Sequence, residues 1–163
     1  MSSTASVVRS SVALDPALLD QSVALLRAMG MWGVAMVEYR IDSRTGQALL
    51  LEVNARLWGS IQLAIDAGVD FPRLLVEVTQ GRAPQVNAYR TDVTVRWWLG
   101  DLLRTIRVLR GRPYGFPGAF PRRRDALRDF LLSRPRGMRN EVLRRDDLLP
   151  ALGELACAAL RRG

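Results

Sequence analysis

Apolar and polar positions at the start of the chain follow the period of a helix. Asp15 is a typical N-cap residue, Pro16 suits the first helical turn, and Gly30 stops the pattern. Between them the apolar residues recur every three or four positions: Leu18, Leu19, Val23, Leu26 and Met29. The spacing predicts an amphipathic helix from Asp15 to Gly30. The small polar residues before it end in residues 10–14, two serines followed by three apolar residues, where we expect a short strand.

The pattern then changes to that of a β-hairpin. Residues 34–41 are rich in apolar and β-branched residues, residues 42–46 have the composition of a turn, and residues 47–53 return as a second strand. Because Ala48 to Leu51 are all apolar, we expect this second strand to be buried. Two helices follow, over residues 58–68 and 70–81, each ended by glycine.

The second half predicts fewer strands. Residues 93–99 form a plausible strand, Asp101 is a candidate cap for a helix ending at Gly111, and residues 112–121 hold three prolines and must be a loop. A short basic helix over residues 122–134 and a final helix after Asp146-Asp147 complete the chain. The fold class is therefore α+β. An antiparallel sheet built on the hairpin, with flanking helices, occupies residues 1–88, and an arginine-rich, mostly helical extension occupies residues 89–163.

Composition limits the chemistry. The 163 residues suffice for one domain, or for a subdomain with an appendage. The absence of histidine and the single cysteine argue against zinc enzymes and Ser-His-Asp hydrolases. No segment resembles a signal peptide or a membrane span, so we expect a cytoplasmic protein without a membrane partner.

The positive charge is confined to the second half. Lysine is absent; residues 1–88 carry 7 arginines and 8 acidic residues, whereas residues 89–163 carry 17 arginines and 8 acidic residues. An anionic partner such as nucleic acid and a high-GC codon bias both explain such a skew. Because the arginines are spread over several elements without interleaved aromatic residues, we favour codon bias over nucleic acid.

Candidate chemistry lies at the end of the second hairpin strand. Alternate side chains of a strand share a face, which predicts that Glu52, Asn54 and Arg56 lie side by side. Carboxylate and amide oxygens suit a hard cation such as Mg²⁺, and a guanidinium binds phosphate bidentately. Glu38 is on the first strand. It lies on the same face as Glu52 if the residue numbers of two paired positions add up to an even number. The stretch therefore predicts a metal-phosphate site.

Several motifs together resemble the C-terminal part of an ATP-grasp domain, over roughly residues 9–84. They comprise Gly33 to Tyr39, the Thr45-Gly46 turn, Leu50 to Arg56, Gly59-Ser60, and Ala67 to Pro72. The carbamoyl-phosphate-synthase-like and biotin-carboxylase-like branches are the most similar. The resemblance implies a ligase that uses ATP with Mg²⁺ or Mn²⁺ to activate a small carboxylate as an acyl phosphate, for attack by an amine or a similar nucleophile.

The resemblance also assigns roles by position. Glu38 would bind one metal ion, Glu52 would bridge two, and Asn54 would bind the second. Arg56 would be catalytic, stabilising the acyl phosphate or its transition state. Arg9 lies before the first helix, where related proteins often carry an arginine near the phosphates or the substrate.

The departures from the family pattern are equally informative. Related enzymes hold the phosphates with lysines from a preceding half, whereas this chain has no lysine and no glycine-rich loop before Asp15. Three explanations stay open: a truncated fragment, a separate chain that supplies the first half, or a loss of catalysis. The isolated chain is expected to be weakly active or inactive. The alternatives to a ligase are a non-catalytic arginine-rich binding module and a pseudoenzyme.

Overall fold

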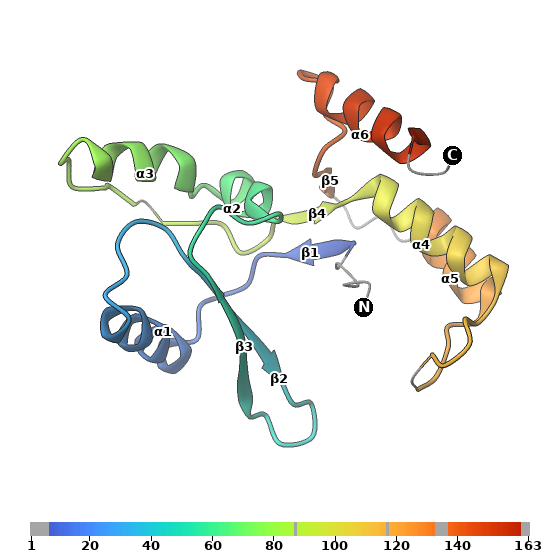
Figure 1. Cartoon of the computed structure of the whole chain (residues 1–163), viewed down its shortest axis with the longest axis horizontal. Coiled ribbons are helices and arrows are strands. Elements are labelled where there is room, and N and C mark those ends of the chain that lie inside the picture. The colour runs from blue at the N-terminus through green and yellow to red at the C-terminus, as the bar shows by residue number, and fades with distance from the viewer. Residues whose placement is uncertain (1–6, 87, 117, 133–136, 161–163) are drawn as a thin grey trace. The chain divides into compact units, whose positions relative to one another are not determined.

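The computed structural model describes residues 7–86, 88–116, 118–132 and 137–160. The chain divides into two compact units, Ser11–Asp92 and Met1–Ser10 with Val93–Gly163. Within the described residues there are six helices and five short strands in two sheets (Figure 1). The predicted α+β class is therefore confirmed.

The unit Ser11–Asp92 begins with the predicted amphipathic helix. Helix α1 spans Pro16–Ala28. The Asp15 carboxylate accepts hydrogen bonds from the backbone N–H groups of Ala17 and Leu18, at 2.8 and 3.3 Å. These bonds satisfy two of the donors that a helix leaves unpaired at its N-terminus. The chain leaves the helix through Gly30, whose positive φ of 62° favours glycine.

The hairpin is also confirmed. Strand β2, Met36–Ile41, pairs antiparallel with strand β3, Ala48–Asn54 (Figure 1). Asp42 organises the turn: its backbone N–H donates to Gln47 at 2.9 Å, and its carbonyl accepts from Gly46 at 2.7 Å. The Tyr39 hydroxyl lies 3.0 Å from the Ser22 hydroxyl, which links the hairpin to α1.

The expected burial of the second strand is wrong. Leu49, Leu50 and Leu51 are 47%, 49% and 55% exposed. Among the described residues, β2 and β3 pair only with each other, so this sheet has two strands and two open edges. An apolar strand is buried only when another layer covers it, and within the described part of the unit Ser11–Asp92 no second sheet layer pairs with or continues this hairpin.

Two helices complete this unit. Helix α2 spans Ile61–Ala67 and ends at Gly68 with a φ of 108°, and helix α3 spans Phe71–Thr79. The Asp70 carboxylate caps α3 by accepting from the Arg73 backbone N–H at 3.0 Å. Both helices were predicted, although α2 starts later than expected. Trp58 and Phe71 meet edge to face, with ring centroids 5.0 Å apart.

The second unit is built on a three-stranded sheet in the order β1-β4-β5. Strand β1, Val8–Ser10, is antiparallel to β4, Thr94–Arg96, which is parallel to β5, Arg139–Asn140. The strand expected at residues 10–14 thus lies earlier, and the strand expected at 93–99 is shorter. The side chain of Val95 is fully buried at the centre.

Asp101 does not cap a helix, contrary to expectation. Helix α4, Trp98–Arg110, starts three residues before it, with Trp97 at the N-cap position. The Asp101 carboxylate is therefore inside the first turn, where it is buried and accepts from Arg96 Nε at 2.8 Å. Arg96 Nη2 also donates to the Phe130 carbonyl at 2.9 Å, and the guanidinium lies 4.9 Å from the centroid of the Phe130 ring.

Two more helices pack in this unit. Helix α5, Arg123–Leu132, lies beside α4 (Figure 1), and helix α6, Leu149–Leu160, follows Asp147, whose carboxylate accepts from the Leu149 N–H at 3.2 Å. Residues 133 and 134 of the predicted basic helix lie outside the described residues. Trp97 Nε1 donates to Glu154 at 2.5 Å, which ties the start of α4 to α6. In the described chain, no helix combines the length and the apolar character that crossing a bilayer requires.

Candidate functional site

A β-bulge in the hairpin brings the two predicted carboxylates face to face. From the turn up to Tyr39, paired positions have an odd sum: Tyr39 pairs with Leu50. The register then shifts, and Glu38 pairs with Glu52. Leu51 is the extra residue between them. Without this bulge Glu38 would pair with Leu51, and Glu52 would point from the opposite face of the sheet.

Asn54 lies beside Glu52 on the same strand. Its side-chain amide donates to the Glu52 carboxylate at 2.5 Å, as expected for two residues that share one face of β3. Both glutamates are exposed, and Asn54 is half-buried. Directly opposite residues of an antiparallel pair have Cβ atoms about 4.5–5.5 Å apart. Two carboxylates and an amide are thus gathered on one side of the hairpin.

Arg56 is not held by the strand. Strand β3 ends at Asn54, and Arg56 lies in the bend that follows. The alternation that predicted Arg56 beside Asn54 therefore does not extend to it. Its guanidinium is exposed and donates to the adjacent Leu57 carbonyl at 3.0 Å. The segment places Arg56 next to the site in sequence, with its side chain exposed to solvent.

Arg9 belongs to the other unit and already has a partner. It lies in β1, and its Nη1 contacts Glu141 Oε2 at 2.5 Å. The side chain of Glu141 is 7% exposed and that of Arg9 is 20% exposed. The contact joins two residues that are far apart in the sequence, and sequence reasoning did not find Glu141. No local signal could have found it, because the pairing depends on β1 meeting β4 and β4 meeting β5.

The donor set at the hairpin fits a hard divalent cation. Mg²⁺ prefers oxygen ligands and usually takes one or two carboxylates together with water and substrate phosphates. Glu38, Glu52 and the Asn54 side-chain oxygen supply such a set. No group of three or more His, Cys, Asp or Glu side chains in the described parts of the chain could hold a metal ion. A cation bound here would therefore complete its coordination with ligands from outside this side-chain set.

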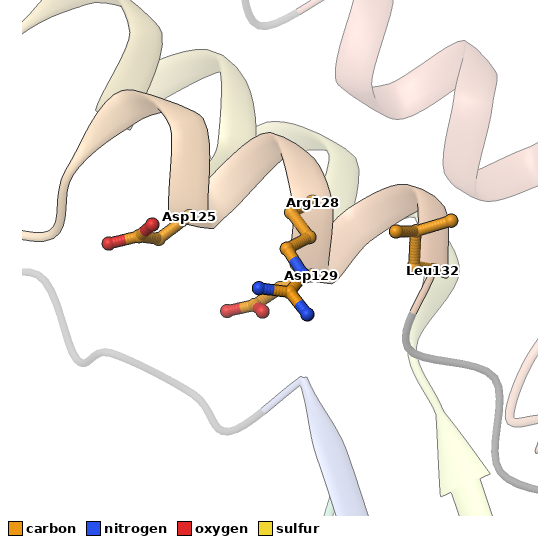
Figure 2. Close-up of a pocket in the computed structure, with 4 residues that line it drawn as sticks. All are labelled: Asp125, Arg128, Asp129 and Leu132. Carbon is orange, nitrogen blue, oxygen red and sulfur yellow. The ribbon is translucent and has the colours of Figure 1, made fainter.

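A cavity of about 360 Å³ lies elsewhere, against α5. Figure 2 shows the side chains that line it: Asp125, Arg128, Asp129 and Leu132. A single helix supplies all of them, and the cavity is open to solvent. We assign the candidate site to the hairpin, because substrate pockets are usually formed by several elements that direct polar groups at one point.

Comparison with known proteins decides the family. The family model described as "ATP-grasp in the biosynthetic pathway with Ter operon" matches residues 4–100. The chain belongs to this ATP-grasp family. The matched region includes the hairpin with Glu38, Glu52 and Asn54, and it ends at Gly100 near the start of α4. Neither the curated proteins nor the solved structures gave a match.

The residue that sequence reasoning missed within the ATP-grasp match is Leu51. Three consecutive leucines interrupt the alternation that a two-faced strand should show. Combined with a turn that sets an odd sum, that interruption is the available signal for a bulge. The even-sum condition for Glu38 and Glu52 is met, but only because Leu51 is left unpaired.

Proposed function

We propose that this chain supplies the metal- and phosphate-binding part of an ATP-grasp ligase. The reaction activates a carboxylate as an acyl phosphate, which an amine or a similar nucleophile then attacks. ATP is the phosphoryl donor, with Mg²⁺ or Mn²⁺ as the cation. The observation that carries the proposal is the opposition of Glu38 and Glu52, produced by the Leu51 bulge within a region that matches the ATP-grasp family.

The roles of the hairpin side chains follow from their positions. Glu38 and Glu52 repel each other across the strands, and a cation between them removes that repulsion. Asn54 donates to Glu52 in the structure, so binding a cation requires the amide to turn its oxygen toward the site. The bound cation would neutralise charge on the triphosphate and align it. Such positioning and charge neutralisation supply most of the catalysis in phosphoryl transfer.

Arg56 is the proposed catalytic residue. Its present acceptor is the neighbouring Leu57 carbonyl, which is a neutral oxygen. A phosphate oxygen accepts a stronger, charge-assisted hydrogen bond, so we propose that Arg56 exchanges one acceptor for the other. Arg9 is a weaker candidate for contacting phosphate, because it would first have to leave the buried carboxylate of Glu141.

We further propose that a second component completes the ATP site. The ATP-grasp enzymes that the chain resembles hold the phosphates with lysines, and this sequence contains none. The exposed leucines of β3 and its open strand edges also favour a missing layer. We also propose that, among ATP-grasp proteins, the chain is most similar to the carbamoyl-phosphate-synthase-like and biotin-carboxylase-like branches.

Calorimetric titration with ATP in the presence and absence of Mg²⁺ tests the metal site. We expect Glu52→Gln to weaken Mg²⁺-dependent binding by about tenfold or more, because it removes a charged metal ligand. Asp20→Asn, an exposed carboxylate on α1, is the matched control and should leave binding unchanged. Equal Mg²⁺-dependent binding by wild type and Glu52→Gln would contradict the assignment.

A second assay tests incompleteness. ADP release by the isolated chain, measured with a panel of amino acids and small carboxylates, should be weak or absent. Robust turnover by this chain alone would show that no further component is needed, whatever the result for Glu52.

A further inference from the structure

The α4–α5 hairpin concentrates positive charge at one place. Residues 102–128 contain a single acidic residue, Asp125, and eight arginines: Arg104, Arg107, Arg110, Arg112, Arg122, Arg123, Arg124 and Arg128. The two helices lie side by side (Figure 1), so the end of α4 and the start of α5 are neighbours. A Cβ atom built on Gly111 would lie 3.4 Å from Arg123 Nη2, which confirms the proximity. Arginines that are separated in sequence are therefore gathered in space.

Only part of this charge is neutralised within the protein: of the eight arginines, Arg104 contacts the Asp101 carboxylate at 3.4 Å. Arg112 Nη2 donates to the carbonyls of Phe116 and Gly118, at 2.8 and 3.2 Å, and so shapes the loop. Arg124 makes one exposed contact with Asp125 at 3.5 Å. In the described part of the chain, the exposed side chains of Arg107, Arg110, Arg122 and Arg128 have no hydrogen bond or ion pair. Such a surface attracts a polyanion.

Apolar side chains alternate with the arginines on one flank of α5. Arg124, Leu127, Arg128 and Leu131 are three or four residues apart, so they form one continuous stripe along the helix. We call these four residues the basic stripe. Leu127 is 43% exposed and Leu131 is 55% exposed, while Ala126 is buried on the face that packs inside the unit. In the loop before the helix, Tyr114 is fully exposed.

The acidic residues of α5 lie away from the centre of this stripe. At 100° per residue, Asp125 and Asp129 lie on the side of the helix opposite Leu127 and Leu131. Figure 2 shows the two aspartates beside Leu132 and Arg128. Arg128 lies between the leucine flank and the aspartate flank of the helix. The stripe thus presents arginine and leucine together, with the carboxylates turned toward the other flank.

We propose that the basic stripe and the neighbouring arginines bind the surface of an anionic phospholipid bilayer. Arginine contacts the anionic headgroups, and exposed leucine and tyrosine side chains enter the interface between headgroups and acyl chains. A polynucleotide would use the arginines but would gain little from Leu127 and Leu131, which is why we favour the bilayer. Peripheral binding of this kind needs no helix that crosses the membrane.

Vesicle co-sedimentation of the full chain tests the proposal. One set of vesicles contains phosphatidylcholine alone, and the other contains equal parts of phosphatidylcholine and phosphatidylglycerol. We expect binding only to the second set, and weaker binding as salt is raised. Arg124→Gln with Arg128→Gln should weaken binding by about fivefold for each arginine. Leu127→Ser with Leu131→Ser should weaken it by about tenfold while leaving the charge unchanged.

Matched controls make the outcome decisive. Arg44→Gln with Arg82→Gln removes the same charge from exposed positions of the other unit and should have little effect. Circular dichroism checks that each variant is folded. The proposal is overturned if anionic vesicles do not bind, or if the leucine variant binds them as well as wild type. It is also overturned if single-stranded polyuridylate binds more tightly than the vesicles and only the arginine variant reduces that binding.

Discussion

The β2–β3 hairpin and the β4–α4 segment use similar residues in opposite ways. In the hairpin, leucines are half exposed and two carboxylates face each other in solvent. In β4 and α4, Val95 is fully buried and the single carboxylate of Asp101 is buried against Arg96. The carboxylates of the first region are exposed to solvent, whereas the carboxylate of the second is buried and hydrogen-bonded to another side chain. The contrast separates a region whose polar groups are exposed from one whose polar groups are paired in the interior.

The largest expected effect is on the buried ion pair. Asp101→Ala leaves the Arg96 guanidinium buried and partly unpaired, and we expect it to lower the free energy of unfolding by about 3–5 kcal/mol. The matched variant Glu77→Ala breaks the Arg73–Glu77 contact of α3, where the Arg73 side chain is 55% exposed. It should cost about 0.5 kcal/mol. Urea denaturation followed by circular dichroism measures both, and equal effects would contradict the contrast.

The next largest effect should come from truncating apolar side chains. We expect it to lower the free energy of unfolding more in β4 than in β3. Val95→Ala removes buried methyl groups and leaves a cavity, so we expect a loss of about 2–3 kcal/mol. Leu50→Ala removes more atoms, but from a side chain that is 49% exposed, and should change the unfolding free energy by about 0.5 kcal/mol. The same denaturation experiment checks the pair. A larger loss for Leu50→Ala would show that the hairpin leucines are covered in solution.

The smallest of the three effects concerns Gly100. A Cβ atom there would overlap the Trp97 indole, which is held by its hydrogen bond to Glu154. We expect Gly100→Ala to destabilise the unit by about 1–3 kcal/mol. Gly153→Ala, in α6, meets nothing within 4 Å and should stabilise the protein by about 0.5–1 kcal/mol. Thermal unfolding midpoints that move in the same direction for both variants would contradict this account.

Local signals in the sequence predicted local structure well. Asp15 caps its helix as expected, and the composition of residues 42–46 located the turn. These features depend on a few neighbouring residues, whose side chains bond to the adjacent backbone. The same is true of Glu52 and Asn54, whose shared face follows from strand geometry alone.

Features that depend on distant partners could not be predicted. Strand β1 is fixed by pairing with β4, and β5 forms only where β4 offers an edge. Aspartate is a common N-cap residue, but Asp101 is instead buried and hydrogen-bonded to Arg96. The leucines of β3 have the composition of a buried strand, yet burial depends on whether another layer is present.

The bulge at Leu51 also affects how relatives of this chain can be compared. Because the bulge absorbs one residue, a hairpin that is one leucine shorter in β3 would keep the same two glutamates opposed without any bulge. The number of residues between the two glutamates can therefore differ by one while the glutamates still face each other across the hairpin. An alignment that insists on a fixed spacing would misplace one carboxylate, whereas one that permits a single-residue gap at Leu51 would keep both.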